Sequence, residues 1–209
     1  MNFTNKIFIL ISFISFANLY SQTSSDQLLN ETKVEKSIYG FQTGFLGAWL
    51  YNESRLSSKF ALRSQVGFDF RIAGVGHFEF AGPNEDIYGI LHLSIEPRWY
   101  YNLDKRIKKD KTIGRNSGNF LSLYVLGNLD GVSFTNNDEL RSIDQIKITP
   151  KWGIRRSLGK YLNYEAGIGL GYVHYINSNS LNNSGGIFAS GSNGDFAVDV
   201  HLRIGFDLQ

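Results

Sequence analysis

The sequence predicts an all-β protein, an eight-stranded antiparallel up-and-down transmembrane β-barrel. Three observations support this fold class. Long segments alternate between apolar and polar residues, the segments are longer than typical strands, and their polar faces mix glycine with charges of both signs. A period of two residues, held along a whole segment, is typical of a strand and has no helical interpretation.

The composition excludes several functional classes. The 21 Lys and Arg residues nearly balance 19 Asp and Glu residues, whereas a nucleic-acid-binding domain carries a strongly basic face. The absence of cysteine excludes zinc ribbons, thiol catalysis, disulfide scaffolds and a lipid anchor on an N-terminal cysteine. The sequence contains no phosphate loop, nucleotide fingerprint or metal-ligand spacing. We therefore expect no cofactor, no bound metal and no nucleic-acid partner.

Residues 1–21 are expected to be a signal peptide. Lys6 precedes an apolar run from Ile7 to Ala17, and small Ser21 stands at the expected cleavage point. This run is too short to cross a bilayer as a helix, which takes about 20 residues. We expect residues 22–36 to form a short polar segment and residues 37–209 to form the barrel. No later stretch is apolar enough for a spanning helix, so this sequence could span a membrane only with strands.

Strand alternation is clear in seven segments, and a barrel with both ends on one side needs an even number. We predict the eighth strand at 75–82, where Phe78 and Phe80 share one face. The seven clear strands run approximately over 38–51, 59–71, 87–101, 119–129, 144–157, 161–175 and 195–208. This count places 52–58, 83–86, 130–143 and 176–194 at the outer end and the turn Gly159-Lys160 in the periplasm.

The apolar face of the strands is predicted to face lipid. Every second residue from Phe196 to Leu208 is apolar, whereas the other face includes Asp199, His201 and Arg203. A soluble barrel also alternates, but strands of this length match the roughly 9–11 residues that cross a bilayer at a tilt. Aromatic residues near the strand ends are expected to form a girdle at the membrane interface. They are Tyr39, Trp49, Tyr51, Trp99, Tyr101 and Trp152.

Charged residues on the polar face are expected to meet inside the barrel. The interior of an eight-stranded barrel is just wide enough to be filled by side chains. Buried charges must pair to recover their desolvation cost, so we expect an ion-pair plug, with a pore or substrate site as the alternative. The candidates are Arg63, Asp69, Arg71, His92, Glu96, Arg98, Lys147, Lys151, Arg155, Glu165, Asp199, His201 and Arg203.

A basic turn follows the strand at 87–101. Its positive residues are Lys105, Arg106, Lys108, Lys109, Lys111 and Arg115. Glycines at 114 and 118 indicate a long turn, which is either a solvated loop or a contact for an anionic partner. Such a partner would be a lipid headgroup, a lipopolysaccharide phosphate or a periplasmic protein. The strand count places this turn in the periplasm, and that side changes if 75–82 is not a strand.

The run Glu-Pro-Arg-Trp-Tyr-Tyr at 96–101, leading into this turn, resembles the small outer-membrane β-barrel proteins of Bacteroidota. The architecture over 38–209 is similar to that of OmpA- and OmpX-like eight-stranded barrels, and PorT-like secretion barrels belong to the same broad group. The resemblance implies an outer-membrane location and contact with outer-membrane lipid, but little about activity. We expect a structural or interaction role without an open pore, because an open channel would need more strands than about 170 residues can provide. Membership of a secretion or transport assembly, through a periplasmic or envelope protein at the basic turn, is the alternative.

A lipid A-modifying enzyme is a further alternative, centred on His174. This residue is expected near Ser178, Ser190 and Asp195, and lipid A deacylases place serine, histidine and an acid on the outer barrel wall. The short His-x-Ser spacing of that family is absent here, because Tyr175 and Ile176 follow His174. We therefore expect an interfacial histidine and no enzymatic activity.

Overall fold

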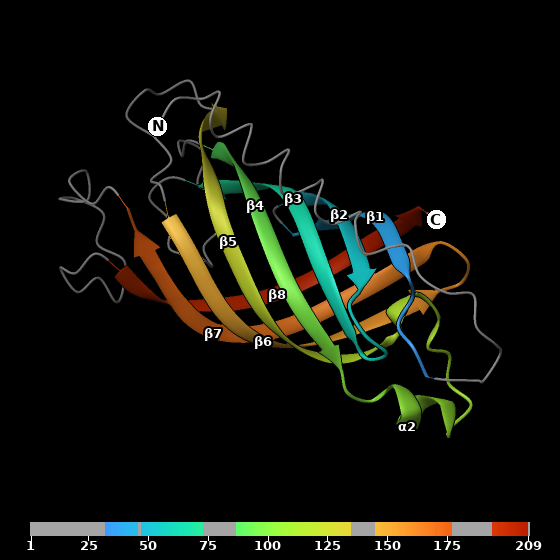
Figure 1. The fold of residues 1–209 in the computed structure, drawn as a ribbon. Helices are drawn as coiled ribbons and strands as arrows, with labels where there is room; N and C mark the ends of the chain where they lie inside the picture. Colours follow the sequence, from blue (N-terminus) through green and yellow to red (C-terminus); the bar gives the residue numbers. More distant parts are fainter. Residues whose placement is uncertain (1–31, 46, 73–86, 135–144, 177–193, 209) are drawn as a thin grey trace. The chain divides into compact units, whose positions relative to one another are not determined.

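The computed structural model describes residues 32–45, 47–72, 87–134, 145–176 and 194–208. In this part of the chain, eight antiparallel strands close into a barrel (Figure 1). Each strand pairs with the next in sequence, and the last strand returns to pair with the first. The predicted eight-stranded, antiparallel, up-and-down barrel is confirmed. The expected signal peptide at 1–21 lies outside the described residues, as does 22–31 of the polar segment.

The strands are β1 (Ser37–Gly44), β2 (Gly47–Arg55), β3 (Phe60–Ile72), β4 (Ile87–Tyr100), β5 (Gly118–Phe134), β6 (Gln145–Leu158), β7 (Leu162–Tyr175) and β8 (Gly194–Leu208). They pair in register except for one shift between β4 and β5, at Ile90 and His92. The connection between β4 and β5 contains a short helix, α2 (Leu103–Ile107), and a 3-10 turn, η1 (Gly114–Asn116). Among the described residues, no helix has the length and apolar character to cross a membrane.

The strand predicted at 38–51 is in fact a hairpin of two strands. Gly44 of β1 pairs with Gly47 of β2, so the chain reverses across only two residues. The two paired glycines face the same side of the sheet, and inward positions therefore change from even numbers in β1 to odd numbers in β2. Alternation across such a tight turn is easily mistaken for one continuous strand.

This hairpin supplies the eighth strand, which corrects the prediction at 75–82. That segment lies outside the described residues. The barrel closes without it, since β3 pairs directly with β4 from Phe60 opposite Trp99 to Ile72 opposite Ile87.

Both described chain ends lie at one end of the barrel, which we call the termini end; the opposite end is the far end. The termini end carries the connections 56–59, 101–117 and 159–161, and the strand ends at Gly44, Ile72, Phe134 and Tyr175 lie at the far end. The basic turn therefore lies at the end that bears the termini, as predicted. The loop 52–58 was predicted at the opposite end. That prediction is wrong, because the β1–β2 hairpin adds one strand before this part of the chain.

The outer face of the barrel is apolar on every strand. Exposed large apolar side chains include Phe41 on β1, Leu50 on β2, Val66 on β3, Ile95 on β4, Leu121 on β5, Ile148 on β6, Ile168 and Leu170 on β7, and Val200 and Leu202 on β8. The interior is mainly polar. Its one hydrophobic cluster among the described residues lies at the termini end and comprises Val34, Ala61, Tyr100, Leu103 and Phe120.

Candidate functional site: the charged interior and its cap

The structure places the candidate charged side chains inside the barrel. Those buried there are Arg63, His92, Glu96, Arg98, Lys151, Arg155, Glu165 and Arg203, while Asp69, Lys147, Asp199 and His201 are partly buried. The side chain of Arg71 lies outside the described part. Inward residues alternate with the exposed apolar residues along each strand, as the period of two requires.

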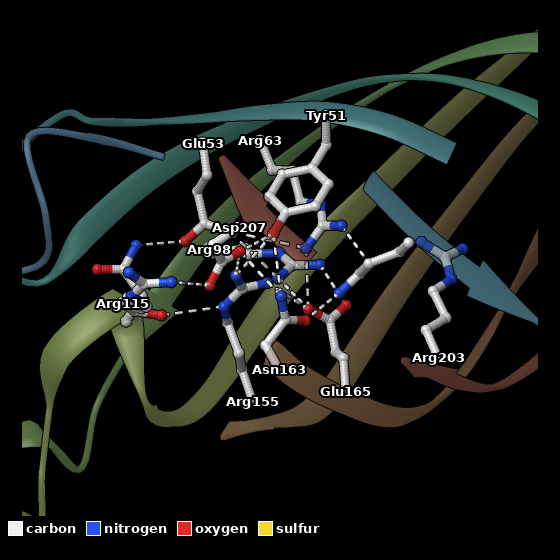
Figure 2. A network of polar contacts seen from close by, with 12 residues as sticks. Tyr51, Glu53, Arg63, Arg98, Arg115, Arg155, Asn163, Glu165, Arg203 and Asp207 are labelled. Atoms are coloured by element: carbon white, nitrogen blue, oxygen red, sulfur yellow. Dashed lines mark hydrogen bonds and ion pairs between the residues drawn. The ribbon is translucent and has the colours of Figure 1, made fainter. Parts of the chain in front are cut away.

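Glu165 is the centre of the interior network. Its carboxylate accepts two hydrogen bonds from Arg98, both of 2.8 Å, and one of 2.9 Å from Arg63. Arg155 approaches the same carboxylate at 3.5 Å. These arginines come from β3, β4 and β6, and Glu165 comes from β7, so the contacts tie opposite walls of the barrel together (Figure 2). All of these side chains are fully buried.

A second buried carboxylate, Glu53 on β2, was not among the sequence candidates. It accepts hydrogen bonds from the Tyr100 hydroxyl at 2.8 Å and from the Asn116 amide at 2.6 Å. It also lies 3.4 Å from Arg98. Position 53 was predicted to lie in the loop 52–58. Every second residue of β2 faces inward from Trp49 onward, and Glu53 would have been identified by following this alternation to position 53.

Asp207 on β8 forms the third centre of negative charge. Its carboxylate accepts hydrogen bonds from Arg155 at 2.7 Å and Asn163 at 2.8 Å, and also from the Tyr51 hydroxyl. Arg115 of the basic turn lies 3.7 Å from its other oxygen. The position alternates with Phe206 and Leu208, so the same periodicity that identified Arg203 also marks Asp207 as inward-facing.

The far half of the interior holds smaller clusters. Asp199 pairs with Lys147 at 2.9 Å, with Lys151 at 3.4 Å and with His201 at 3.3 Å. Arg203 has no carboxylate within 4.0 Å among the described residues. It instead donates to Gln65 at 3.0 Å and lies 4.0 Å above the Trp49 ring.

Only part of the predicted aromatic girdle faces outward. Tyr39, Trp99, Tyr101 and Trp152 are exposed on the outer face, as expected. The prediction is wrong for Trp49 and Tyr51, which lie inside the barrel. The tight β1–β2 turn changes which numbers face inward, and so reverses the side on which these two residues lie.

The inward aromatic residues take part in the charged interior. The Arg63 guanidinium lies 3.8 Å from the centre of the Tyr51 ring, and the Arg155 guanidinium lies 5.3 Å from the same ring centre. Aromatic faces attract cations, and the attraction is stronger where water is excluded. Tyr51 therefore stabilises two of the buried arginines, beside the carboxylates that pair with them.

Aromatic contacts on the outer face gather at the termini end. Phe60 stacks on Trp99 with ring centres 6.1 Å apart, and the Trp152 indole donates to the Tyr101 hydroxyl at 2.9 Å. On the adjacent part of the wall, Tyr161 stacks on Phe206 at 5.4 Å.

The basic turn is a cap on the termini end rather than a simple solvated loop. Leu103 and Asn116 are buried, and Asn116 donates to Glu53 in the barrel interior. The backbone carbonyl of Arg115 accepts a hydrogen bond of 3.0 Å from Arg155. Of the six basic residues, Lys105, Lys108, Lys109 and Lys111 are exposed, while Arg106 and Arg115 are partly buried.

The segment 32–36 completes this cap. Val34 donates its backbone N–H to the carbonyl of Ser58 at 2.9 Å and accepts from the Arg55 side chain at 2.6 Å. The next residue, Glu35, donates its backbone N–H to the side-chain oxygen of Asn116 at 2.6 Å. The termini end is therefore closed by residues from three separate parts of the chain.

One exposed ion pair holds α2 to the β2–β3 connection. Lys59 donates a hydrogen bond to the carboxylate of Asp104. This bond lowers the pKa of Asp104, which remains ionised well into the acidic range. Burial in turn lowers the pKa of Arg106, two residues further along.

His174 is exposed on the outer face of β7, opposite Ile146 of β6 and Gly194 of β8. Its predicted neighbours Ser178 and Ser190 lie outside the described residues. No group of three or more His, Asp or Glu side chains in the described ranges could hold a metal ion.

No protein-family model, curated protein or solved structure matches this chain. The fold and the interior define its class: an eight-stranded closed β-barrel with a charged, ion-paired interior, an apolar outer face and a capped end.

Proposed function

We propose that this protein is an integral outer-membrane β-barrel with a structural or interaction role, no open pore and no catalytic activity. One observation carries the proposal: the arrangement of polarity is the reverse of that in a water-soluble protein. Arg63, Arg98, Arg155 and Glu165 are 0% exposed. On the outside, Val200 and Leu202 are 60% and 68% exposed.

The outer face is too apolar to be stable in water. Soluble monomers rarely expose contiguous apolar patches larger than a few hundred Å². Here the exposed apolar residues continue around all eight strands. Transfer of such a surface into hydrocarbon is favourable by about 25 cal/mol per Å². A closed barrel also leaves no strand edge unpaired in lipid.

Tryptophan quenching tests membrane insertion, because the three tryptophans differ in placement. Trp99 and Trp152 are 41% and 43% exposed on the outer face, whereas Trp49 is 8% exposed inside. We expect brominated phospholipids to quench variants that retain only Trp99 or only Trp152. The variant that retains only Trp49 is the matched control and should keep its fluorescence. Equal quenching of all three, or of none, would contradict a lipid-facing outer wall.

Participation in a secretion or transport assembly is the second candidate, and the exposed lysines of the basic turn favour it. The exposed lysines project from a connection that the buried Leu103 and Asn116 anchor to the barrel end; they are Lys105, Lys108, Lys109 and Lys111. A photo-crosslinker at Lys109 should capture one recurrent envelope protein in intact cells. The control position is Ser58, on another connection at the same end. Capture of nothing specific at Lys109 would remove this candidate.

The lipid A-modifying alternative is tested through His174. Because this side chain is exposed on the outer wall, replacement by alanine should leave the barrel intact. We expect the lipid A mass spectrum of cells with His174→Ala to equal that of cells with the unaltered protein. If the unaltered protein changed the mass of lipid A and the His174→Ala variant did not, the protein would have an enzymatic role.

A further inference from the structure

Arg106 in α2 carries a positive charge without a carboxylate partner. Its Nε and Nη2 donate to the backbone carbonyl of Thr112 at 3.0 and 2.8 Å. These bonds fold the side chain back onto its own connection and orient the guanidinium. No Asp or Glu of the described ranges lies within 4.0 Å of it, and its Nη1 has no protein acceptor there.

Arg156 in β6 is held in the same way. Its Nη1 donates to the carbonyls of Gly118 and Arg155, both at 2.7 Å, and its Nη2 donates to the side chain of Asn119 at 2.5 Å. All these acceptors are neutral. Within the described ranges no carboxylate lies within 4.0 Å of this guanidinium either, and its Nε donates to no protein group.

The two arginines lie next to each other through Asn119 and Asn102. Asn119 accepts the hydrogen bond from Arg156 and donates its backbone N–H to the Asn102 side-chain oxygen at 2.7 Å. The backbone carbonyl of Asn102 accepts from the backbone N–H of Arg106 at 3.0 Å, and the charge of Arg106 acts on Arg156. Two like charges held together in a half-buried position are unfavourable unless an anion lies between or beside them. The described residues provide no such anion.

The pair lies where lipid headgroups would be. Asn119, which accepts from Arg156, donates its side-chain N–H to the Tyr101 hydroxyl at 3.3 Å, and Tyr101 also accepts the hydrogen bond from Trp152. The arginines therefore stand beside the outward aromatic residues of the termini end. Aromatic residues of this kind mark the membrane interface. Toward the far end, the outer wall of β7 continues with the exposed side chains of Ile168 and Leu170, which provide an apolar surface for acyl chains.

We propose that Arg106 and Arg156 form a binding site for the phosphate of an anionic phospholipid. The site rests on the proposed membrane insertion. Guanidinium groups bind phosphate oxygens through several N–H donors at once, and each arginine has donors left after its protein contacts. The exposed lysines of the basic turn add a wider positive field at the same end. The adjoining apolar wall favours a lipid over free phosphate.

The test uses Trp152 as a reporter beside the site. Trp99→Phe leaves Trp152 as the only lipid-facing tryptophan, because Trp49 lies inside. The mature chain with this background is refolded into phosphatidylcholine bilayers. Brominated phosphatidylglycerol or brominated phosphatidylcholine is then added at equal mole fractions, and the two quenching curves give the relative lipid affinity at Trp152.

We expect phosphatidylglycerol to be preferred roughly fivefold or more at this position. Arg106→Gln with Arg156→Gln should remove the preference. Lys109→Gln with Lys111→Gln is the matched control, since it removes the same charge from exposed positions and should keep most of the preference. Inorganic phosphate at millimolar concentration should leave the preference in place.

Three results would overturn the proposal. An equal loss in the lysine control would show that only the general field attracts the lipid. Abolition of the preference by inorganic phosphate would assign the site to the free anion. Quenching without any lipid preference in the unaltered chain would refute the site while membrane insertion stands, whereas absence of all quenching at Trp152 would refute both.

Discussion

Among the described residues, Glu165 contacts more buried arginines than any other carboxylate of the interior. It accepts hydrogen bonds from Arg63 and Arg98 and lies 3.5 Å from Arg155. Buried charges lose their hydration, and mutual attraction recovers that cost only when partners and hydrogen bonds are complete. Glu165 thus determines whether the arginine layer stabilises or destabilises the barrel.

Replacement of Glu165 should therefore strongly destabilise the folded state. Glu165→Ala and Glu165→Gln both leave the surrounding arginines without their shared carboxylate, and breaking a buried pair costs about 3–5 kcal/mol. The free energy of unfolding would be measured by urea titration in phospholipid vesicles.

The matched control for this prediction is Asp104→Ala. Asp104 also pairs with a basic residue, Lys59, but both side chains are exposed to solvent. Exposed pairs contribute little, so the unfolding midpoint of this variant should stay close to that of the unaltered chain. Equal destabilisation by the two substitutions would mean that the interior network is not the main electrostatic contribution to stability.

At the scale of the strands, large and small residues alternate across the sheet. Trp49 of β2 lies opposite Gly67 of β3, and Gly67 lies opposite His92 of β4. A Cβ at position 67 would lie 2.1 Å from the Trp49 ring and 2.5 Å from His92. The glycine thus provides the space into which two large inward side chains pack.

A side chain at position 67 should destabilise the barrel. We expect Gly67→Ala to cost about 1–3 kcal/mol, because overpacking forces neighbouring side chains out of their preferred rotamers. Gly127→Ala is the control, since a Cβ there would meet no atom within 4 Å. Urea unfolding of both variants checks the prediction, and adding Trp49→Leu should restore part of the loss. Equal stability of the two alanine variants would contradict the packing argument.

The strand scale also explains what the sequence could predict and what it could not. From β3 to β8 each strand is long and most of its residues alternate, so residues such as Arg63, Arg98 and Glu165 were correctly assigned to the inward face. The β1–β2 turn is so short that the apolar pattern passes through it. That one error reversed the side assigned to Trp49 and Tyr51 and hid Glu53.

The cap could not be predicted because its contacts are long-range in sequence. The positive charge of the 105–115 stretch indicated a solvated turn, and Lys105, Lys108, Lys109 and Lys111 do face solvent. The burial of Leu103 and the bond from Asn116 to Glu53 depend on where the barrel end lies in space. No local pattern marks such residues as partners.

At the scale of the whole molecule, the interior is sealed in two successive layers. The first is the charged layer, in which side chains from β2, β3, β4 and β6 meet those of β7 and β8 across the lumen (Figure 2). The second is the cap at the termini end, where Leu103 packs with Tyr100 and Phe120. We expect either layer alone to obstruct the passage of hydrated ions.

The unaltered protein should therefore give no stepwise current in planar lipid bilayers. The double variant Arg98→Ala with Glu165→Ala removes one positive and one negative charge and thins the charged layer without changing its net charge. It should remain closed as well, because Leu103 still packs with Tyr100 and Phe120, and Asn116 still donates to Glu53, when these two side chains are shortened. Adding Leu103→Ala with Asn116→Ala weakens the second seal, and brief current steps are then expected. Resolved, steady current steps in the unaltered chain would contradict the sealed interior, and a silent quadruple variant would show that the remaining interior side chains suffice to close it.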